Sequence, residues 1–356
     1  MEDGSPVQGS PFTKLYVGVF VVLLGFTVLL TFLSIPAGVY AVFSGHLSKT
    51  YDYTALLTPY FWIGPAVTSV PFQLSVGAWF LILTAIYVAF FAIALKQKQG
   101  PLQATSAAFK EGLGAIMSSP FVVVMVSIGF LTFTASIADD LISSAGVPIG
   151  GLSGDPLALI IGFTAAPLVE ELGFRVLIIG VVALILSMRR PLREVLGSLW
   201  RPSVAVEGLA LGSGASIIIW VATGFSAATF GICHVACGGT SWDTGKVLEA
   251  GYAGVVLGYL YVRYGFHVAV LAHWGVNFLG SAFAFFGQAA YGIPWDSNTG
   301  EFIGQYLVDL DLLLLFGLAS FVLVLYLGVK KLAGSSRIPE TGDFDKAPSG
   351  GGTVEA

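Results

Sequence analysis

The segment PLVEELGFRVLIIG, residues 167–180, places three charged side chains in an otherwise apolar stretch. An unpaired charge in the middle of a bilayer costs about 3 kcal/mol or more. Residues four apart share a helix face, so Glu171 and Arg175 can neutralise each other. Glu170 points about 100° away from Glu171 on a helix. It is therefore either protonated and inert, or it meets a polar group on another helix.

Two other apolar segments carry polar residues at helical spacing. His234 follows Phe230 by one turn in TFGICHVACGG, and Asn277 follows His273 by one turn in VLAHWGVNFLG. Buried His and Asn side chains need polar partners in a membrane, as Glu170 does. Ionisable groups inside a membrane are by default candidates for function. We therefore expect these side chains to converge on one site.

The chemistry that such a site could perform is peptide hydrolysis. This reaction needs a base for water and hydrogen-bond donors for the oxyanion. Glu170 can act as the base, because Glu171 occupies Arg175. An imidazole and a carboxamide one turn apart can direct two N–H donors at one oxygen. No serine or cysteine nucleophile is required.

The elements that must position these residues are membrane helices. The chain is 56% hydrophobic and only 10% charged, whereas a soluble domain has roughly 25% charged residues. Several apolar runs reach about 20 residues, the length of helix that crosses a bilayer core of about 30 Å. The predicted fold class is all-α, a polytopic transmembrane helix bundle. The net charge of −5 and the absence of a basic patch give nucleic-acid binding no support.

We predict about eight spans in a transmembrane domain of residues 13–332. A polar segment, 1–12, precedes this domain, and a polar tail rich in Gly, Ser and Pro, 333–356, is predicted to be disordered. The spans are expected at about 14–35, 75–95, 120–138, 156–188, 213–234, 247–263, 266–287 and 306–329.

Basic residues gather in alternate connections between these spans. They are Lys14, Lys96 to Lys110, Arg189 to Arg201, Arg263, and Lys330 to Arg337. The positive-inside rule then predicts a multi-pass protein of the cell membrane with both termini in the cytoplasm. Glu170 lies in the first half of its span and His234 ends the next one, so the site lies toward the end away from the arginines at 189–201.

Three motifs occur in order along the chain. EELGFR (170–175) fits Glu-Glu-x-x-x-Arg, FGICH (230–234) fits Phe-x-x-x-His, and HWGVN (273–277) fits His-x-x-x-Asn. This ordered set resembles the CPBP family of CAAX proteases and bacteriocin-processing enzymes, also called the Abi family. Its best-known members are the Rce1-type CAAX prenyl endopeptidases. The resemblance covers about residues 155–285.

The resemblance implies a metal-independent intramembrane endopeptidase without a cofactor. Glu170 resembles the family's catalytic glutamate, and His234 the histidine that helps to hold and activate water. His273 and Asn277 resemble the pair that stabilises the oxyanion. The supporting residues would be Glu171, Arg175 and Phe230. The implied partner is a membrane-associated or lipidated protein or peptide in the bilayer. Rce1-type enzymes act on cytosolic substrates, so the resemblance implies a site on the cytoplasmic side. The basic residues of this chain place the site on the other side.

Two alternatives remain open from the residues alone. Cys233, His234 and Cys237 could form a zinc site together with a second histidine, making a zinc-dependent membrane protease. However, no His-Glu-x-x-His occurs, and cysteines at a helix end are more often packing residues. The buried Glu and His residues could also relay protons in a transporter, although no symmetric pair of broken helices is visible.

Overall fold

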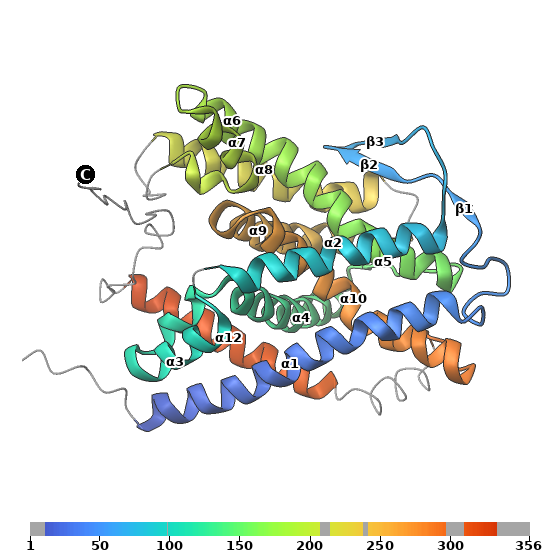
Figure 1. The fold of residues 1–356 in the computed structure, drawn as a ribbon, viewed down its shortest axis with the longest axis horizontal. Helices are drawn as coiled ribbons and strands as arrows, with labels where there is room; N and C mark the ends of the chain where they lie inside the picture. The colour runs from blue at the N-terminus through green and yellow to red at the C-terminus, as the bar shows by residue number, and fades with distance from the viewer. Residues whose placement is uncertain (1–10, 98, 207–213, 238–240, 297–309, 333–356) are drawn as a thin grey trace, which may run out of the picture.

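Long apolar helices make up most of the chain in a computed structural model that describes residues 11–97, 99–206, 214–237, 241–296 and 310–332 (Figure 1). The all-α bundle predicted from composition is confirmed. The longest helices are α1 (Pro11–Phe43), α2 (Val76–Lys96), α4 (Pro120–Ser144), α8 (Gly214–Ala236), α9 (Thr244–Tyr264), α10 (Phe266–Tyr291) and α12 (Leu310–Leu332). The predicted tail at 333–356 and residues 1–10 lie outside the described residues.

Six helices of the described chain are long and apolar enough to cross a membrane. They lie within α1, α2, α4, α8, α10 and α12. The predicted spans at 156–188 and 247–263 are present as helical segments but are not among these six. The number of eight spans therefore remains a prediction.

The charged segment is one continuous helical run whose winding changes in the middle. It begins as α5 (Pro156–Glu170), where the Asp155 carboxylate accepts the Leu157 N–H and Pro156 occupies the first turn. It continues as a π-helix, η2 (Glu171–Gly180), and ends as α6 (Val181–Ser187). π-Helical turns are rare and occur frequently at functional sites. The change of winding falls between the two adjacent glutamates.

Helices α8 and α9 pack closely because glycines replace side chains where they meet. A Cβ atom on Gly258 would lie 2.7 Å from the methyl group of Thr223, and one on Gly254 would lie 3.0 Å from the Cα atom of Ala227. Gly231 allows the same close approach to the backbone of α9. Small residues commonly permit such contacts between membrane helices. These contacts run in antiparallel order along the second half of α8 and most of α9.

At one end of the bundle the connection between α1 and α2 forms two short antiparallel pairs. β1 (Leu56–Leu57) pairs with β4 (Leu74–Ser75), and β2 (Tyr60–Ile63) pairs with β3 (Ala66–Ser69). In Figure 1 this connection lies on the right, beside the beginning of α5. It is a small antiparallel element on a helical protein.

Hydrogen bonds join the connections at this end into a structure that we call the loop rim. The loop rim comprises residues 44–75, 145–155, 241–243 and 288–295. Gly150 forms an isolated antiparallel bridge with Trp242. The Ser48 hydroxyl donates to the Asp155 carboxylate, and the Gln288 amide donates to the Leu47 carbonyl over 2.8 Å. Segments far apart in the sequence therefore surround one end of the bundle.

The opposite end carries the short helices. They are α3 (Pro101–Glu111), η1 (Leu113–Ser118), α7 (Leu192–Trp200) and η3 (Pro202–Val204). Trp200 stacks on His267 with ring centroids 5.4 Å apart, and Gln97 Nε2 lies 3.1 Å from His267 Nε2. The Tyr261 hydroxyl donates to the Leu199 carbonyl over 2.6 Å. The two ends are thus distinct, as Figure 1 shows with α3 and α7 on the left.

Candidate active site

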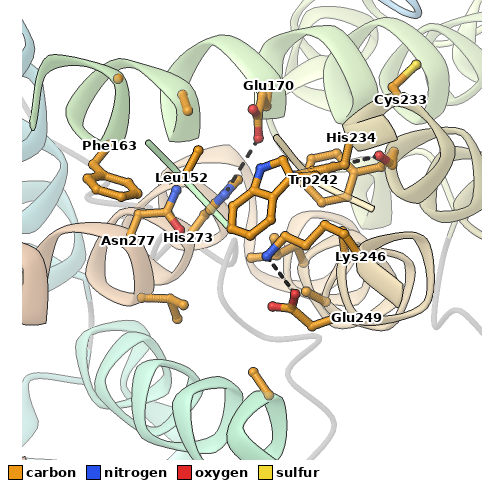
Figure 2. Close-up of a pocket in the computed structure, with 18 of the residues that line it drawn as sticks. Leu152, Phe163, Glu170, Cys233, His234, Trp242, Lys246, Glu249, His273 and Asn277 are labelled. Atoms are coloured by element: carbon orange, nitrogen blue, oxygen red, sulfur yellow. Dashed lines mark hydrogen bonds and ion pairs between the residues drawn. The ribbon is translucent and has the colours of Figure 1, made fainter. Parts of the chain in front are cut away.

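One cavity of about 640 Å³ brings together the polar residues that the sequence singled out. Glu170, His234, His273 and Asn277 all line it, and they come from three different helical segments (Figure 2). Much of the remaining wall is apolar; it includes Leu131, Ala135, Ala158, Leu159, Gly162, Phe163, Leu257 and Val276. An apolar cavity with a few convergent polar groups is the usual form of a ligand site.

Glu171 connects the charged segment to α10. Its Oε2 atom lies 3.2 Å from Arg175 Nε, and its Oε1 atom lies 3.0 Å from His273 Nδ1. The Glu171 and Arg175 side chains are fully buried. The predicted pairing of Glu171 with Arg175 is therefore present. His273 is a third member of this group that the local spacing did not reveal.

Arg175 is held by two further contacts inside the protein. Its guanidinium carbon lies 4.2 Å from the centroid of the Phe230 ring, a distance at which a cation is attracted to an aromatic face. Its terminal nitrogen also donates to the Gly254 carbonyl over 3.5 Å. The contact of Arg175 Nε with Glu171 Oε2 is an ion pair without hydrogen-bond geometry. Arg175 thus links η2 to both α8 and α9.

Glu170 differs from its neighbour because it reaches the cavity. Its side chain is 17% exposed, whereas that of Glu171 is 0% exposed. Its Oε2 atom lies 3.7 Å from His273 Nε2, the interaction drawn as a dashed line in Figure 2. One glutamate therefore neutralises a buried arginine, and the other faces the space where a substrate could bind.

His234 is oriented by the residue one turn before it. His234 Nδ1 lies 2.9 Å from the Phe230 carbonyl oxygen. Because a carbonyl only accepts hydrogen bonds, Nδ1 carries the proton, and Nε2 of the neutral ring is an acceptor. The Phe230 ring also packs edge-on against the imidazole, with centroids 4.7 Å apart. These contacts account physically for the Phe-x-x-x-His spacing.

His273 uses one of its two ring nitrogens on a carboxylate. An ionised carboxylate only accepts hydrogen bonds, so His273 Nδ1 donates to Glu171. The Nε2 atom, which faces Glu170, then carries a proton only if the ring is an imidazolium. Asn277 lies one turn further along the same wall, and its amide has N–H donors in every protonation state.

The β2–β3 hairpin contributes wall residues that sequence analysis missed. Tyr60 and Trp62 line the cavity, and the Trp62 ring lies 5.9 Å from that of Phe174. A Cβ atom on Gly173 would lie 2.5 Å from Trp62 Cβ, so the glycine in EELGFR permits this contact. Burial raises the pKa of Tyr60, and the Glu170 carboxylate raises it further. The glycine at position 173 is the feature of the sequence that could have indicated close packing of another segment against this helix.

A second ion pair lines the cavity on α9. Lys246 Nζ lies 2.6 Å from Glu249 Oε2, and both side chains are largely buried, at 15% and 14% exposed. The Lys246 ammonium also lies 4.2 Å from the centroid of the Trp242 ring. In Figure 2 this pair lies across the cavity from Glu170. Sequence analysis gave these residues no role, because their partners are near neighbours on an ordinary helical turn.

Cys233 and Cys237 form a disulfide at the end of α8. This corrects the expectation that the two cysteines are packing residues. Cys233 contributes to the cavity wall beside His234. In the described part of the chain no group of three or more His, Cys, Asp or Glu side chains could hold a metal ion. Sulfurs that are joined to each other are not thiolate ligands, so the zinc alternative lacks its cysteine donors in this structure.

Comparison with known proteins shows a family to which the central part of this chain is similar. The model of the family described as type II CAAX prenyl endopeptidase Rce1-like matches residues 153–279. This segment includes all three motifs, and the match confirms the resemblance to the CAAX protease family. No curated protein and no solved structure matches the chain. Together with the six candidate spans, the family match supports a membrane protease, and it does not favour a transporter.

Proposed function

We propose that this protein is a metal-independent intramembrane endopeptidase in which Glu170 and His234 activate water. The observation that carries the proposal is the division between two adjacent glutamates. Glu171 is fully buried on Arg175, while Glu170 faces a cavity that also contains His234, His273 and Asn277. A carboxylate that is not occupied by the arginine can accept a proton from water.

Water activation uses two acceptors on two helices. Glu170 takes a proton from the water molecule, and His234 Nε2 accepts a hydrogen bond from the same molecule. The Phe230 carbonyl supports this role, because it holds the His234 proton on Nδ1 and leaves Nε2 as the acceptor. The resulting hydroxide adds to the carbonyl carbon of the scissile peptide bond.

The tetrahedral oxyanion then needs N–H donors. Asn277 supplies one from its amide, and His273 supplies one from Nε2 as an imidazolium whose other N–H is held by Glu171. Donors that are already oriented stabilise such a charge without reorganisation during the reaction. Glu170 finally passes its proton to the amide nitrogen as the C–N bond breaks, which restores its carboxylate and releases the amine.

The substrate is a membrane-associated or lipidated protein or peptide. The apolar wall between α4, α5 and α10 supports this assignment, since it can bury apolar groups that enter from the bilayer. The description of the matching family names prenyl endopeptidases. A prenylated substrate is therefore the first to test.

The experiment compares two cavity glutamates in purified protein. Glu170→Gln should reduce cleavage about 10²- to 10⁴-fold, because it removes the base. Glu249→Gln, a carboxylate across the same cavity, is the matched control and should retain activity. The probe is a quenched fluorescent peptide ending in a farnesylated CAAX sequence, assayed beside its unprenylated form. Undiminished cleavage by Glu170→Gln would reject the mechanism.

If neither peptide is cleaved, the same two variants can be compared in cells. Sequencing of new protein N-termini in membranes should then reveal products in cells with the parent protein and Glu249→Gln, and none with Glu170→Gln. Products shared by all three strains come from other proteases. If every product is shared, the proposal is contradicted.

A further inference from the structure

The candidate cavity extends toward only one end of the bundle. Among the described residues that line it, Tyr60, Trp62, Leu152, Trp242 and Trp295 all belong to the loop rim. None belongs to the short helices or connections of the opposite end. A substrate that enters from water therefore reaches Glu170 past the loop rim.

The two ends of the bundle carry opposite charges. Among the described residues at and beside the loop rim acidic ones dominate, namely Asp52, Asp139, Asp140, Asp155, Asp243, Glu249 and Asp296, with Lys49 and Lys246 as the basic ones. At the opposite end basic residues dominate the part that the structure describes, namely Lys14, Lys96, Lys110, Arg189, Arg190, Arg193, Arg201, Arg263, Lys330 and Lys331, with Glu111 and Glu194 as the acids there. An excess of Lys and Arg marks the cytoplasmic side of a membrane protein.

A separate observation agrees with this charge bias. The Cys233–Cys237 disulfide lies on the last turn of α8, which leads into the loop rim. Disulfides persist in oxidising compartments and are rare in the cytosol, where thiols are kept reduced. Neither cysteine lies at the end of the bundle that carries the basic residues.

We propose that the cavity opens on the non-cytoplasmic face of the membrane, so that its substrates are proteins or peptides presented outside the cytoplasm. Both described chain ends, α1 at its start and α12 at its end, then face the cytoplasm. That these molecules are substrates rests on the proposed function, whereas the orientation of the cavity does not. This orientation is opposite to that of the cytosolic substrates that the resemblance to Rce1-type enzymes implies.

The test uses one added cysteine at a time in the otherwise native chain. Ser153→Cys lies in the loop rim and Ser106→Cys lies on α3, and both serines are exposed. Spheroplasts are treated with a membrane-impermeant maleimide and then lysed, and the remaining thiols are tagged with a maleimide polymer that shifts the band on a gel. The parent chain gives the baseline of its own two cysteines.

The expected result is that Ser153→Cys is blocked in intact spheroplasts, whereas Ser106→Cys is tagged only after lysis. The reverse pattern places the cavity on the cytoplasmic side and overturns the proposal. Equal reaction of both positions in intact spheroplasts also overturns it, since it would put the two ends on one side. The measurement does not depend on proteolysis, so it stands even if the proposed function fails.

An activity measurement then tests the orientation of the cavity together with the proposed function. A membrane-impermeant quenched peptide is added outside spheroplasts that contain the parent protein or Glu170→Gln. Once this peptide is shown to be cleaved in detergent, external cleavage by the parent alone supports an outward cavity. Cleavage in detergent but not by intact spheroplasts contradicts the orientation while leaving the proposed function intact.

Discussion

His273 Nδ1 lies 3.0 Å from Glu171 Oε1, although the two residues are 102 positions apart and belong to different helices. Glu171 therefore has two tasks, because its other oxygen pairs with Arg175. The carboxylate that makes a buried arginine tolerable also fixes the direction of a histidine ring in the cavity. In this way the buried charge of η2 is coupled to the geometry of α10.

Removing Arg175 should destabilise the protein more than removing the charge of Glu170. Arg175→Ala leaves Glu171 unpaired in the core, and breaking a buried pair from one side costs about 3–5 kcal/mol. We expect a lower melting temperature in detergent and loss of activity. Glu170→Gln should lose activity at an unchanged or higher melting temperature. If the two variants exchange these phenotypes, the roles of the two glutamates have been assigned the wrong way round.

Asn277→Ala should lower kcat with little effect on KM. It removes one donor to the oxyanion, a loss that costs about 10²- to 10³-fold in other hydrolases. The measurement is steady-state cleavage of the peptide that the parent protein accepts. Ser281→Ala, one turn further along α10, is the control, since among the described residues the Ser281 hydroxyl bonds to backbone carbonyls of its own helix. A large rise in KM at constant kcat for Asn277→Ala would assign Asn277 to ground-state binding instead.

The local parts of this site could be predicted from sequence, and the long-range parts could not. Glu171 and Arg175 are four residues apart, so helical geometry alone predicts their contact. The link from Glu171 to His273 depends on how α10 packs against η2, which no local pattern contains. The same is true of Trp62, whose hairpin carries no residues with recognisable chemistry. The helices themselves were predictable because long apolar runs in lipid have no alternative to backbone hydrogen bonding within the segment.

Boundaries and windings were less predictable than the existence of the helices. The first span was expected to end near residue 35, but α1 continues through Pro36 to Phe43. Apolar residues continue beyond Pro36, and a helix in lipid can absorb a proline. A search for apolar residues at a period of 3.6 could not show that η2 is a π-helix instead of an α-helix. The disulfide at Cys233 and Cys237 was also unexpected, since a spacing of four residues occurs more often without a bond.

Gly173→Ala should disturb the hairpin that covers the cavity. The added Cβ atom would lie 2.5 Å from Trp62 Cβ and 2.8 Å from the Trp62 carbonyl oxygen, so β2 would have to move. We expect a raised KM and faster cleavage of the 60–69 hairpin by an added protease. Gly224→Ala on α8 is the matched control, because nothing lies within 4 Å of its added Cβ atom. Equal behaviour of the two variants would show that the hairpin contact does not shape the cavity.

Chelators should leave proteolysis largely unchanged, because Glu170 and His234 activate water without a metal in the proposed mechanism. Cys233→Ser and Cys237→Ser should likewise remain active, since the proposed mechanism gives neither sulfur a role. The measurements are cleavage rates after treatment with a strong chelator and elemental analysis of the purified protein for zinc. Activity that is lost to the chelator and restored by zinc, together with inactive cysteine variants, would instead establish a zinc-dependent membrane protease whose ligands include the reduced form of this cysteine pair.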